Sequence, residues 1–169
     1  MEKKALQEKL FTACDSAKEG KTIISLVEQG ADVHEVDSFG LTPLMRAALF
    51  NSSAQVIKAL IECGSDVGRR EPQYKSTALQ LASNHNPHPQ IIEALVEAGS
   101  DIYDVNYLGE TALIMAVNSQ NATKVISALI RSGSDVNAKD YQDRTALYYA
   151  KSAKRNYVVK ILKAAGAVE

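Results

Sequence analysis

The residues best suited to metal chemistry are the three histidines and two cysteines of this chain. His85 and His88 flank an Asn-Pro dipeptide, and imidazole nitrogen is a common metal ligand. A zinc site needs about four ligands that converge in space, however, and His34 and Cys63 lie in different segments of the sequence. We therefore interpret His85 and His88 as solvent-facing loop residues and predict that the chain holds no metal.

Catalytic motifs are missing from the sequence. It contains no Gly-rich phosphate loop, no Gly-x-Ser-x-Gly and no His-Glu-x-x-His. Cys14 occupies a small-residue position in an expected helix, which favours a buried, inert thiol over a nucleophile paired with His34. Asp32 belongs to a short pattern that recurs along the chain, which favours loop hydrogen bonding over catalysis. We predict neither enzymatic activity nor a cofactor.

The composition narrows the class of protein further. The chain has 169 residues, of which 46% are hydrophobic and 23% charged, and its formal net charge is −1. This balance argues against a strongly basic nucleic-acid binder and against a disordered chain. No apolar run approaches the roughly 20 residues of a membrane helix, and the charged N-terminus lacks the apolar stretch of a signal peptide. Two cysteines make no disulfide framework, so we expect a reducing, cytoplasmic location, while an exported effector stays open.

Two short motifs recur in step along the chain. A Gly-Ala/Ser-Asp-Val/Ile motif starts at residues 30, 64, 99 and 133, and a final Gly-Ala-Val starts at residue 166. A Thr-Pro/Ala-Leu motif starts at residues 42, 77, 111 and 145. Successive copies lie 33–35 residues apart, which is typical of a repeat protein. Five units of this length fill the chain and leave no room for a second domain.

Each unit has the pattern of two short helices. The Thr of the Thr-Pro/Ala-Leu motif can cap the free N–H groups at a helix start, and Pro43 suits the first turn. A second stretch carries apolar residues three and four apart, such as Ile57 with Leu60 and Ile61, which is the period of an amphipathic helix. The glycine that follows is the residue that most readily ends a helix.

The units resemble the ankyrin repeat. Residues 37–48 read Asp-Ser-Phe-Gly-Leu-Thr-Pro-Leu-Met-Arg-Ala-Ala, and residues 133–138 read Gly-Ser-Asp-Val-Asn-Ala. The resemblance covers about residues 5–169. It implies an all-α solenoid of helix–loop–helix units with short β-hairpin loops that project to one side. We expect a single domain over residues 1–169, with repeats at approximately 5–36, 37–71, 72–105, 106–139 and 140–169.

The chain departs from the family pattern in three ways. The family's His after Thr-Pro-Leu is missing, so its bond between repeats is absent or replaced; the residues at that position are Met45, Gln80, Ile114 and Tyr148. Lys75 and Asp143 replace the loop glycine of the third and fifth units, which predicts tips of different shape. The first unit lacks Thr-Pro-Leu and the last is rich in lysine, as expected of caps whose outer faces meet solvent.

The resemblance implies that a partner binds the loop tips and the exposed ends of the first helices. Five of the ten Phe and Tyr residues fall on this face, and exposed aromatic rows are typical of protein interfaces. Some of these rings could instead pack against the adjacent loop and stiffen it. The candidate partner-binding residues are Ser38, Phe39, Leu41, Leu49, Phe50, Gln73, Tyr74, Ser76, Asn84, His85, Tyr107, Leu108, Glu110, Asn118, Tyr141, Gln142 and Arg144.

Charge is distributed unevenly along the chain. Residues 139–169 hold seven Lys or Arg and three Asp or Glu, a net of +4, against a net of −5 for residues 1–138. The C-terminal end is either an ordinary solvated cap or a basic surface that attracts an acidic partner. Arg69, Arg70 and Lys75 form a second basic group, which could bind a carboxylate or a phosphate.

The sequence therefore predicts a protein–protein interaction module that presents a rigid concave surface to a protein partner. An inhibitor or antitoxin-like adaptor that blocks an enzyme, and a host-directed effector, are alternatives on the same fold, because fold alone does not determine function. We expect a monomer with no nucleic-acid, membrane or metal partner. The missing catalytic motifs disfavour an enzyme, and the net charge of −1 disfavours a nucleic-acid binder.

The stacked units predict a core of leucines. Replacing any one of them by Ala is expected to lower the free energy of unfolding, measured by urea denaturation, by about 2–5 kcal/mol. The reason is that no unit buries its apolar face alone. A change below about 0.5 kcal/mol would instead place that leucine on the surface. The leucines are Leu44, Leu60, Leu79, Leu95, Leu113, Leu129, Leu147 and Leu162.

Overall fold

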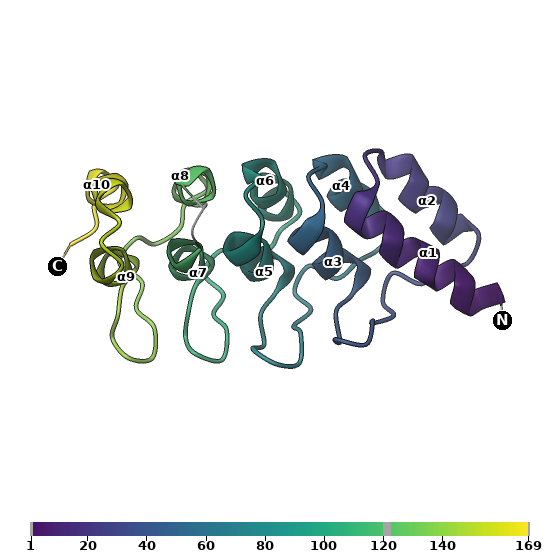
Figure 1. The fold of residues 1–169 in the computed structure, drawn as a ribbon, viewed down its shortest axis with the longest axis horizontal. Coiled ribbons are helices and arrows are strands. Elements are labelled where there is room, and N and C mark those ends of the chain that lie inside the picture. The colour runs from purple at the N-terminus through teal and green to yellow at the C-terminus, as the bar shows by residue number, and fades with distance from the viewer. Residues whose placement is uncertain (1, 120–122, 169) are drawn as a thin grey trace.

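The chain forms a row of helix pairs, which confirms the expected all-α solenoid. The computed structural model describes residues 2–119 and 123–168, and these residues form ten α-helices. The odd-numbered helices make one layer, the even-numbered helices make a second, and loops project below the odd-numbered layer (Figure 1). The helices are α1 (Glu2–Ser16), α2 (Gly20–Glu28), α3 (Pro43–Phe50), α4 (Ala54–Glu62), α5 (Ala78–His85), α6 (Pro89–Glu97), α7 (Ala112–Asn118), α8 (Thr123–Arg131), α9 (Ala146–Ser152) and α10 (Asn156–Ala164).

The local sequence explains where these helices begin and end. The Oγ1 atoms of Thr42, Thr111 and Thr145 accept hydrogen bonds from the backbone N–H groups three residues ahead, at the starts of α3, α7 and α9. Two residues after each even-numbered helix stands a glycine, and these five glycines have φ between +90° and +105°. Glycine adopts this left-handed conformation without steric penalty, so the chain leaves the helix there.

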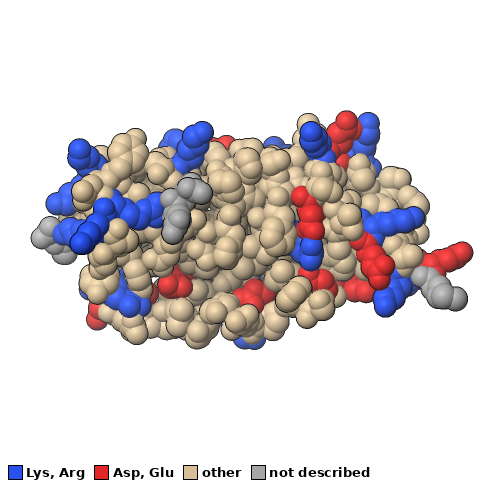
Figure 2. Space-filling model, viewed as in Figure 1, with Lys and Arg blue, Asp and Glu red and all other residues tan. Residues whose placement is uncertain are grey.

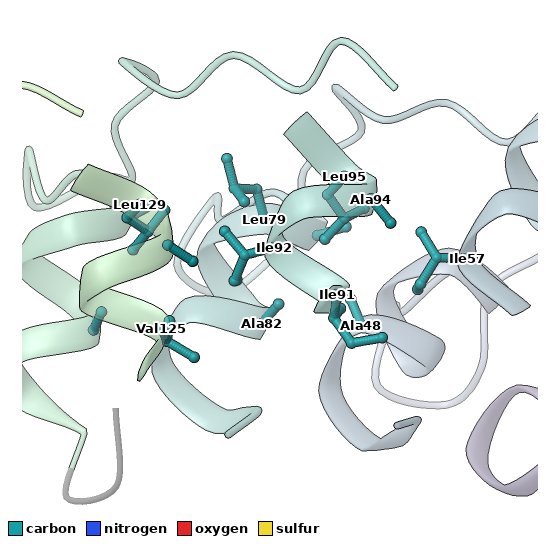
Figure 3. Close-up of a cluster of buried hydrophobic side chains, with 14 of the residues drawn as sticks. Ala48, Ile57, Leu79, Ala82, Ile91, Ile92, Ala94, Leu95, Val125 and Leu129 are labelled. Carbon is teal, nitrogen blue, oxygen red and sulfur yellow. The ribbon is translucent and has the colours of Figure 1, made fainter. Parts of the chain in front are cut away.

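Apolar side chains between neighbouring helix pairs make up the core. The eight leucines expected inside the stack are confirmed, since each is at most 1% exposed. Figure 3 shows one such seam, where Ile91 and Ile92 of α6 lie between Ile57 of α4 and Val125 of α8. Each helix pair therefore buries its apolar surface against its neighbours rather than within itself.

The two ends of the row are polar where the inner seams are apolar. Thr22 of α2 lies eight residues before the glycine that ends the helix. At the same position, every later even-numbered helix has a buried Val or Ile. At the other end, Lys151 of α9 is exposed at the position where α3, α5 and α7 bury Ala48, Ser83 and Val117. The outer faces of the first and last pairs are thus unsuited to a further apolar pair, as expected of caps.

Buried amides join successive pairs where the odd-numbered helices end. The Nδ2 atom of Asn51, which follows α3, donates to the backbone oxygens of Cys14 and Ala17 at 2.8 and 3.0 Å. The Nδ2 atom of Asn86, which follows α5, donates to the oxygens of Ala48 and Asn51 at 2.9 and 2.8 Å. Both side chains are buried, so they satisfy carbonyl groups that the helices leave without partners.

Asn86→Ala is expected to lower the free energy of unfolding by about 1–3 kcal/mol, because two buried carbonyls lose their donor. Urea denaturation of the purified protein measures the change. Asn84→Ala is the matched control, since Asn84 is only half-buried and its amide lies beside the adjacent His85. The control is expected to change the free energy by less than about 0.5 kcal/mol, and equal effects of the two substitutions would contradict the role of Asn86 at the seam.

Candidate functional site

Four loops project from the odd-numbered layer, and we call them the tip loops; they are residues 37–41, 71–76, 106–110 and 140–144. Each is closed by its own first side chain. In the first, Oδ1 of Asp37 accepts hydrogen bonds from the backbone N–H groups of Phe39 and Leu41 at 2.8 and 3.0 Å. Asn106 and Asp140 close the third and fourth loops in the same way. These bonds hold each loop in shape without help from a partner.

Lys75 and Asp143 adopt the left-handed backbone conformation of the glycines that they replace, so the expectation that these substitutions change the tips is wrong as far as this backbone angle is concerned. Their φ values are 58° and 59°, in the left-handed region that Gly40 and Gly109 occupy at 77° and 79°. A residue with a Cβ is strained in this region and persists there only when the surrounding structure holds it. The closing bonds of the loops supply that constraint.

The second tip loop differs in length rather than in handedness. Its closing bond joins the N–H of Glu71 to the oxygen of Ser76, five residues on, whereas the other three loops close over four residues. The Glu71 carboxylate accepts hydrogen bonds from the N–H groups of Gln73, Tyr74 and Ser76 at 2.6–3.0 Å. The additional methylene of Glu, compared with Asp, therefore accommodates the additional residue of this loop.

Backbone hydrogen bonds join three of the tip loops into one row. The N–H of Tyr107 donates to the oxygen of Tyr74 at 2.9 Å, and the N–H of Tyr141 donates to the oxygen of Leu108 at 3.1 Å. The matching position in the second loop is Pro72, which has no N–H to donate to the first loop. The first loop is therefore joined to the others less firmly than they are to each other.

The loops contain very little β-structure. Within the described ranges, β-bridges occur as two isolated pairs, Val105 with Thr111 and Lys139 with Thr145. The short β-hairpins implied by the family resemblance are therefore hydrogen-bonded turns with at most one bridge each. The bonds between neighbouring loops, rather than extended strands, keep the tips aligned.

An aromatic side chain is exposed on every tip loop. Phe39, Tyr74, Tyr107 and Tyr141 are between 43% and 74% exposed, as is Phe50 at the end of α3, and we call these five residues the aromatic row. The rings of Tyr74 and Tyr107 lie with centroids 5.6 Å apart, so these two rings also stiffen the loops. The alternative interpretation, that rings pack against the adjacent loop, thus holds for these two, and both rings still present apolar surface to solvent.

The other candidate residues separate by exposure. Ser76 is wrong as a contact residue, because its side chain is fully buried and its N–H is held by Glu71. The exposed candidates are Ser38, Gln73, His85, Leu108, Asn118 and Gln142. The half-buried candidates are Leu41, Leu49, Asn84, Glu110 and Arg144.

The positively charged side chain of Arg46 lies beside the aromatic row, and it was not among the candidate residues predicted from the sequence. The guanidinium of Arg46 on α3 lies 5.5 Å from the ring centroid of Phe50 and 6.0 Å from that of Phe11 on α1. It pairs with Asp15 on α1 and, at 3.0 Å, with Asp37. Hydrogen bonding to Asp15 raises the pKa of Arg46 above its usual value, so this group stays charged. Asp15 and Arg46 are 31 residues apart, and no local sequence pattern marks them as partners.

Gln80 replaces the bond that the family's His makes between repeats. Its Nε2 atom donates to the backbone oxygens of Asp104 and Glu110 at 2.9 and 3.2 Å, which ties α5 to the following loop. Met45 and Ile114, at the same position of other units, are buried and apolar. Of these three units, one therefore has a replacement bond and the other two rely on packing at this position.

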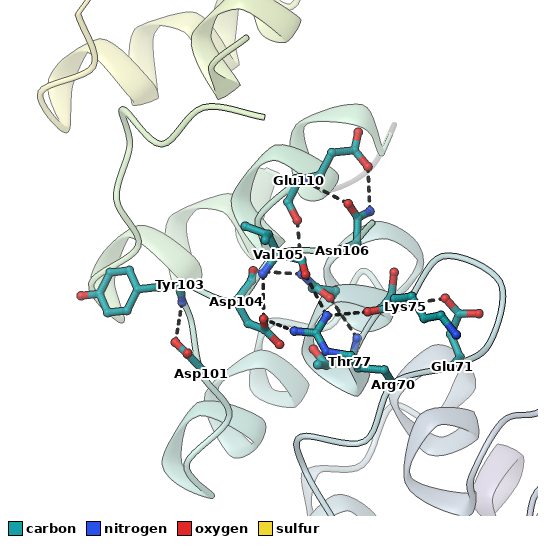
Figure 4. Close-up of polar contacts among 12 residues, drawn as sticks. Arg70, Glu71, Lys75, Thr77, Asp101, Tyr103, Asp104, Val105, Asn106 and Glu110 are labelled. Carbon is teal, nitrogen blue, oxygen red and sulfur yellow. Dashed lines mark hydrogen bonds and ion pairs between the residues drawn. The ribbon is translucent and has the colours of Figure 1, made fainter. Parts of the chain in front are cut away.

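Arg70 bonds within the protein rather than to an external anion. It forms an ion pair with Asp104 and donates to the oxygens of Lys75 and Val105 at 2.7 and 2.8 Å, as Figure 4 shows. The carboxylate that Arg70 meets is thus one of the chain's own, that of Asp104. This contact braces the second tip loop against the segment that leads into the third tip loop.

Comparison with known proteins identifies the family. A family model described as ankyrin repeats in three copies matches residues 10–106 and again residues 86–168. The chain belongs to the ankyrin-repeat family. Its members are generally non-enzymatic and generally act in protein–protein interaction, and the latter is the class of function predicted from the sequence. A search of curated proteins finds no match.

Cys14 is chemically inert in this ankyrin array. Its side chain is fully buried, and burial raises the pKa of its thiol to about 12, with a smaller contribution from Asp15. The reactive thiolate is therefore scarce at neutral pH.

Among the described residues, no three or more His, Cys, Asp or Glu are grouped so as to hold a metal ion. No helix in the same residues is long and apolar enough to cross a membrane.

Gly109→Ala is expected to destabilise the joined tip loops. The new Cβ would lie 2.6 Å from the backbone nitrogen of Tyr141, at a φ of +79° that L side chains rarely adopt. We expect the free energy of unfolding, measured in urea, to fall by about 1–3 kcal/mol. Lys75→Ala is the matched control, because that position already carries a Cβ at φ 58°. A loss as large for the control as for Gly109→Ala would contradict the close approach at Gly109.

Proposed function

We propose that this ankyrin array binds a protein partner through the aromatic row and the neighbouring ends of its odd-numbered helices. The observation that carries the proposal is the exposure of aromatic rings on loops whose backbones the chain itself holds in place. Large aromatic side chains contribute much of the binding free energy at protein interfaces. A surface that is already ordered binds with a small entropic cost, because few side chains and no loops must be immobilised.

Arg46 supports an interface that extends to the N-terminal end of the row. Its guanidinium is held between two carboxylates and lies against Phe11 and Phe50, so neither ring needs to rearrange before binding. Arg and aromatic residues are the types most enriched in interface hot spots. This end does not call for an acidic partner surface, since the charge of Arg46 is already neutralised by Asp15 and Asp37.

The variant in which Phe39, Tyr74 and Tyr107 are all replaced by Ala is expected to lose its partner. The protein is immobilised, incubated with lysate of its native cell, and the captured proteins are quantified by mass spectrometry. A true partner is retained by the unchanged protein and lost from the variant, while the helical circular dichroism of both stays the same. The loss follows from removing three of the five exposed rings of the row.

Tyr157→Ala is the matched control for that experiment. Tyr157 is 67% exposed but lies on α10, away from the tip loops, so its removal is expected to leave capture unchanged. Capture of the same proteins in the same amounts by the triple variant would contradict the assignment of the aromatic row. If only the Tyr157 variant lost capture, the interface would instead lie on the even-numbered helices.

A further inference from the structure

The charged side chains of the tip loops have partners within the chain, with one exception. These loops carry five Asp or Glu and two Lys or Arg, a net of −3. The carboxylates of Glu71 and Glu110 accept hydrogen bonds from backbone N–H groups of the second loop and from the Asn106 amide. The exception is Lys75, whose exposed ammonium group has no hydrogen bond or ion pair to any described residue. The remaining charges form the ion pairs Asp37 with Arg46, Asp140 with Arg144, and Asp143 with Lys139.

The backbone of Lys75 is both strained and fixed. Its φ of 58° is one that residues with a Cβ rarely adopt, and glycine occupies the same position in the first and third tip loops. Its carbonyl oxygen accepts a hydrogen bond from Arg70 at 2.7 Å (Figure 4), and the N–H groups of the residues on either side donate to Glu71. Strain of this kind is concentrated at functional sites in proteins. The lysine is therefore held on a backbone that need not rearrange when a partner binds.

The surface next to Lys75 is uncharged and partly apolar. Lys75 directly follows Tyr74, whose ring centroid lies 5.6 Å from that of Tyr107, and Leu108 beside Tyr107 is 40% exposed. Figure 2 shows a broad uncharged surface in the middle of the molecule, over α5. A partner that covers this region removes water from the ammonium group, and this is costly unless the partner supplies a negative charge. The partner groups around that charge meet rings and neutral side chains.

We propose that Lys75 selects the partner by pairing with an Asp or Glu of a protein segment whose flanking apolar residues lie on Tyr74 and Tyr107. This inference rests on the proposed function, because it assigns the specificity of the same aromatic row. A carboxylate fits better than a phosphate, since Lys75 offers one ammonium group and the nearby N–H groups already donate to Glu71. The net charge of −3 on the tip loops disfavours nucleic acids and anionic membranes, which bring many negative charges.

A phage-displayed library of random peptides of about 12 residues, long enough when extended to contact more than one tip loop, is the probe. Peptides retained by the unchanged protein are expected to share an Asp or Glu between apolar residues. Peptides retained by the Lys75→Glu variant are expected to carry Lys or Arg there instead. A synthetic copy of one acidic peptide, titrated by calorimetry, is expected to bind this variant about tenfold more weakly than the unchanged protein. Lys75→Gly, which places the glycine of two other tip loops at this position and so preserves the fold, is expected to weaken binding about threefold.

Lys124→Glu is the matched control, since it makes the same change of charge at an exposed position of α8, in the even-numbered layer. It is expected to bind the acidic peptide as the unchanged protein does, and equal weakening by this control would overturn the proposal.

The selection also separates this proposal from the proposed function. Retained peptides without a shared acidic residue that are lost from the triple Ala variant would overturn the role of Lys75 and leave the aromatic row in place. Acidic peptides that the triple variant binds equally well, or a selection that retains no peptide, would overturn both. Tighter binding of the same peptide with phosphoserine in place of its acidic residue, or of a DNA duplex or phosphatidylserine vesicles at the same salt concentration, would overturn the carboxylate in favour of a phosphate.

Discussion

Contact between successive helix pairs is the interaction on which every other feature of this protein depends. A single pair has no interior of its own, and Ile57, Ile92 and Ile126 are buried because another pair covers them. The Thr and Gly residues that begin and end the helices keep the pairs in register, so each apolar side chain meets its counterpart. Asn51 and Asn86 then satisfy the carbonyl groups that the helix ends bring into these seams.

The surface of the array follows from the same stacking. Because the helix pairs lie side by side, the tip loops that connect them are brought close enough for Tyr107 and Tyr141 to bond to the preceding loops. Aromatic rings can then stay exposed on a backbone that does not need a partner to become ordered. The outer faces of the first and last pairs carry exposed polar residues, Thr22 and Lys151, at positions that are buried in the inner seams.

The periodic features of the structure could be predicted from the sequence, because each repeats with the 33–35-residue spacing of the units. The buried leucines, the left-handed glycines and the helix caps are of this kind. Features that depend on which side chains meet across a seam could not be predicted. Arg46 with Asp15 and Arg70 with Asp104 join residues 31 and 34 apart, and no local pattern shows that they touch. Ser76 was misplaced because its short side chain is fully buried at the loop-closing position, where Leu41, Glu110 and Arg144 are half-buried.

The stack itself holds the tip loops and their exposed aromatic rings in place, without a partner. Amide hydrogen exchange of the free protein, followed residue by residue by NMR, tests this claim most directly. The amides of Tyr107 and Tyr141, which donate to the neighbouring loops, are expected to exchange at least about 100-fold more slowly than in an unstructured chain. Exchange of these two amides at the unstructured rate, with the helices still protected, would contradict the account.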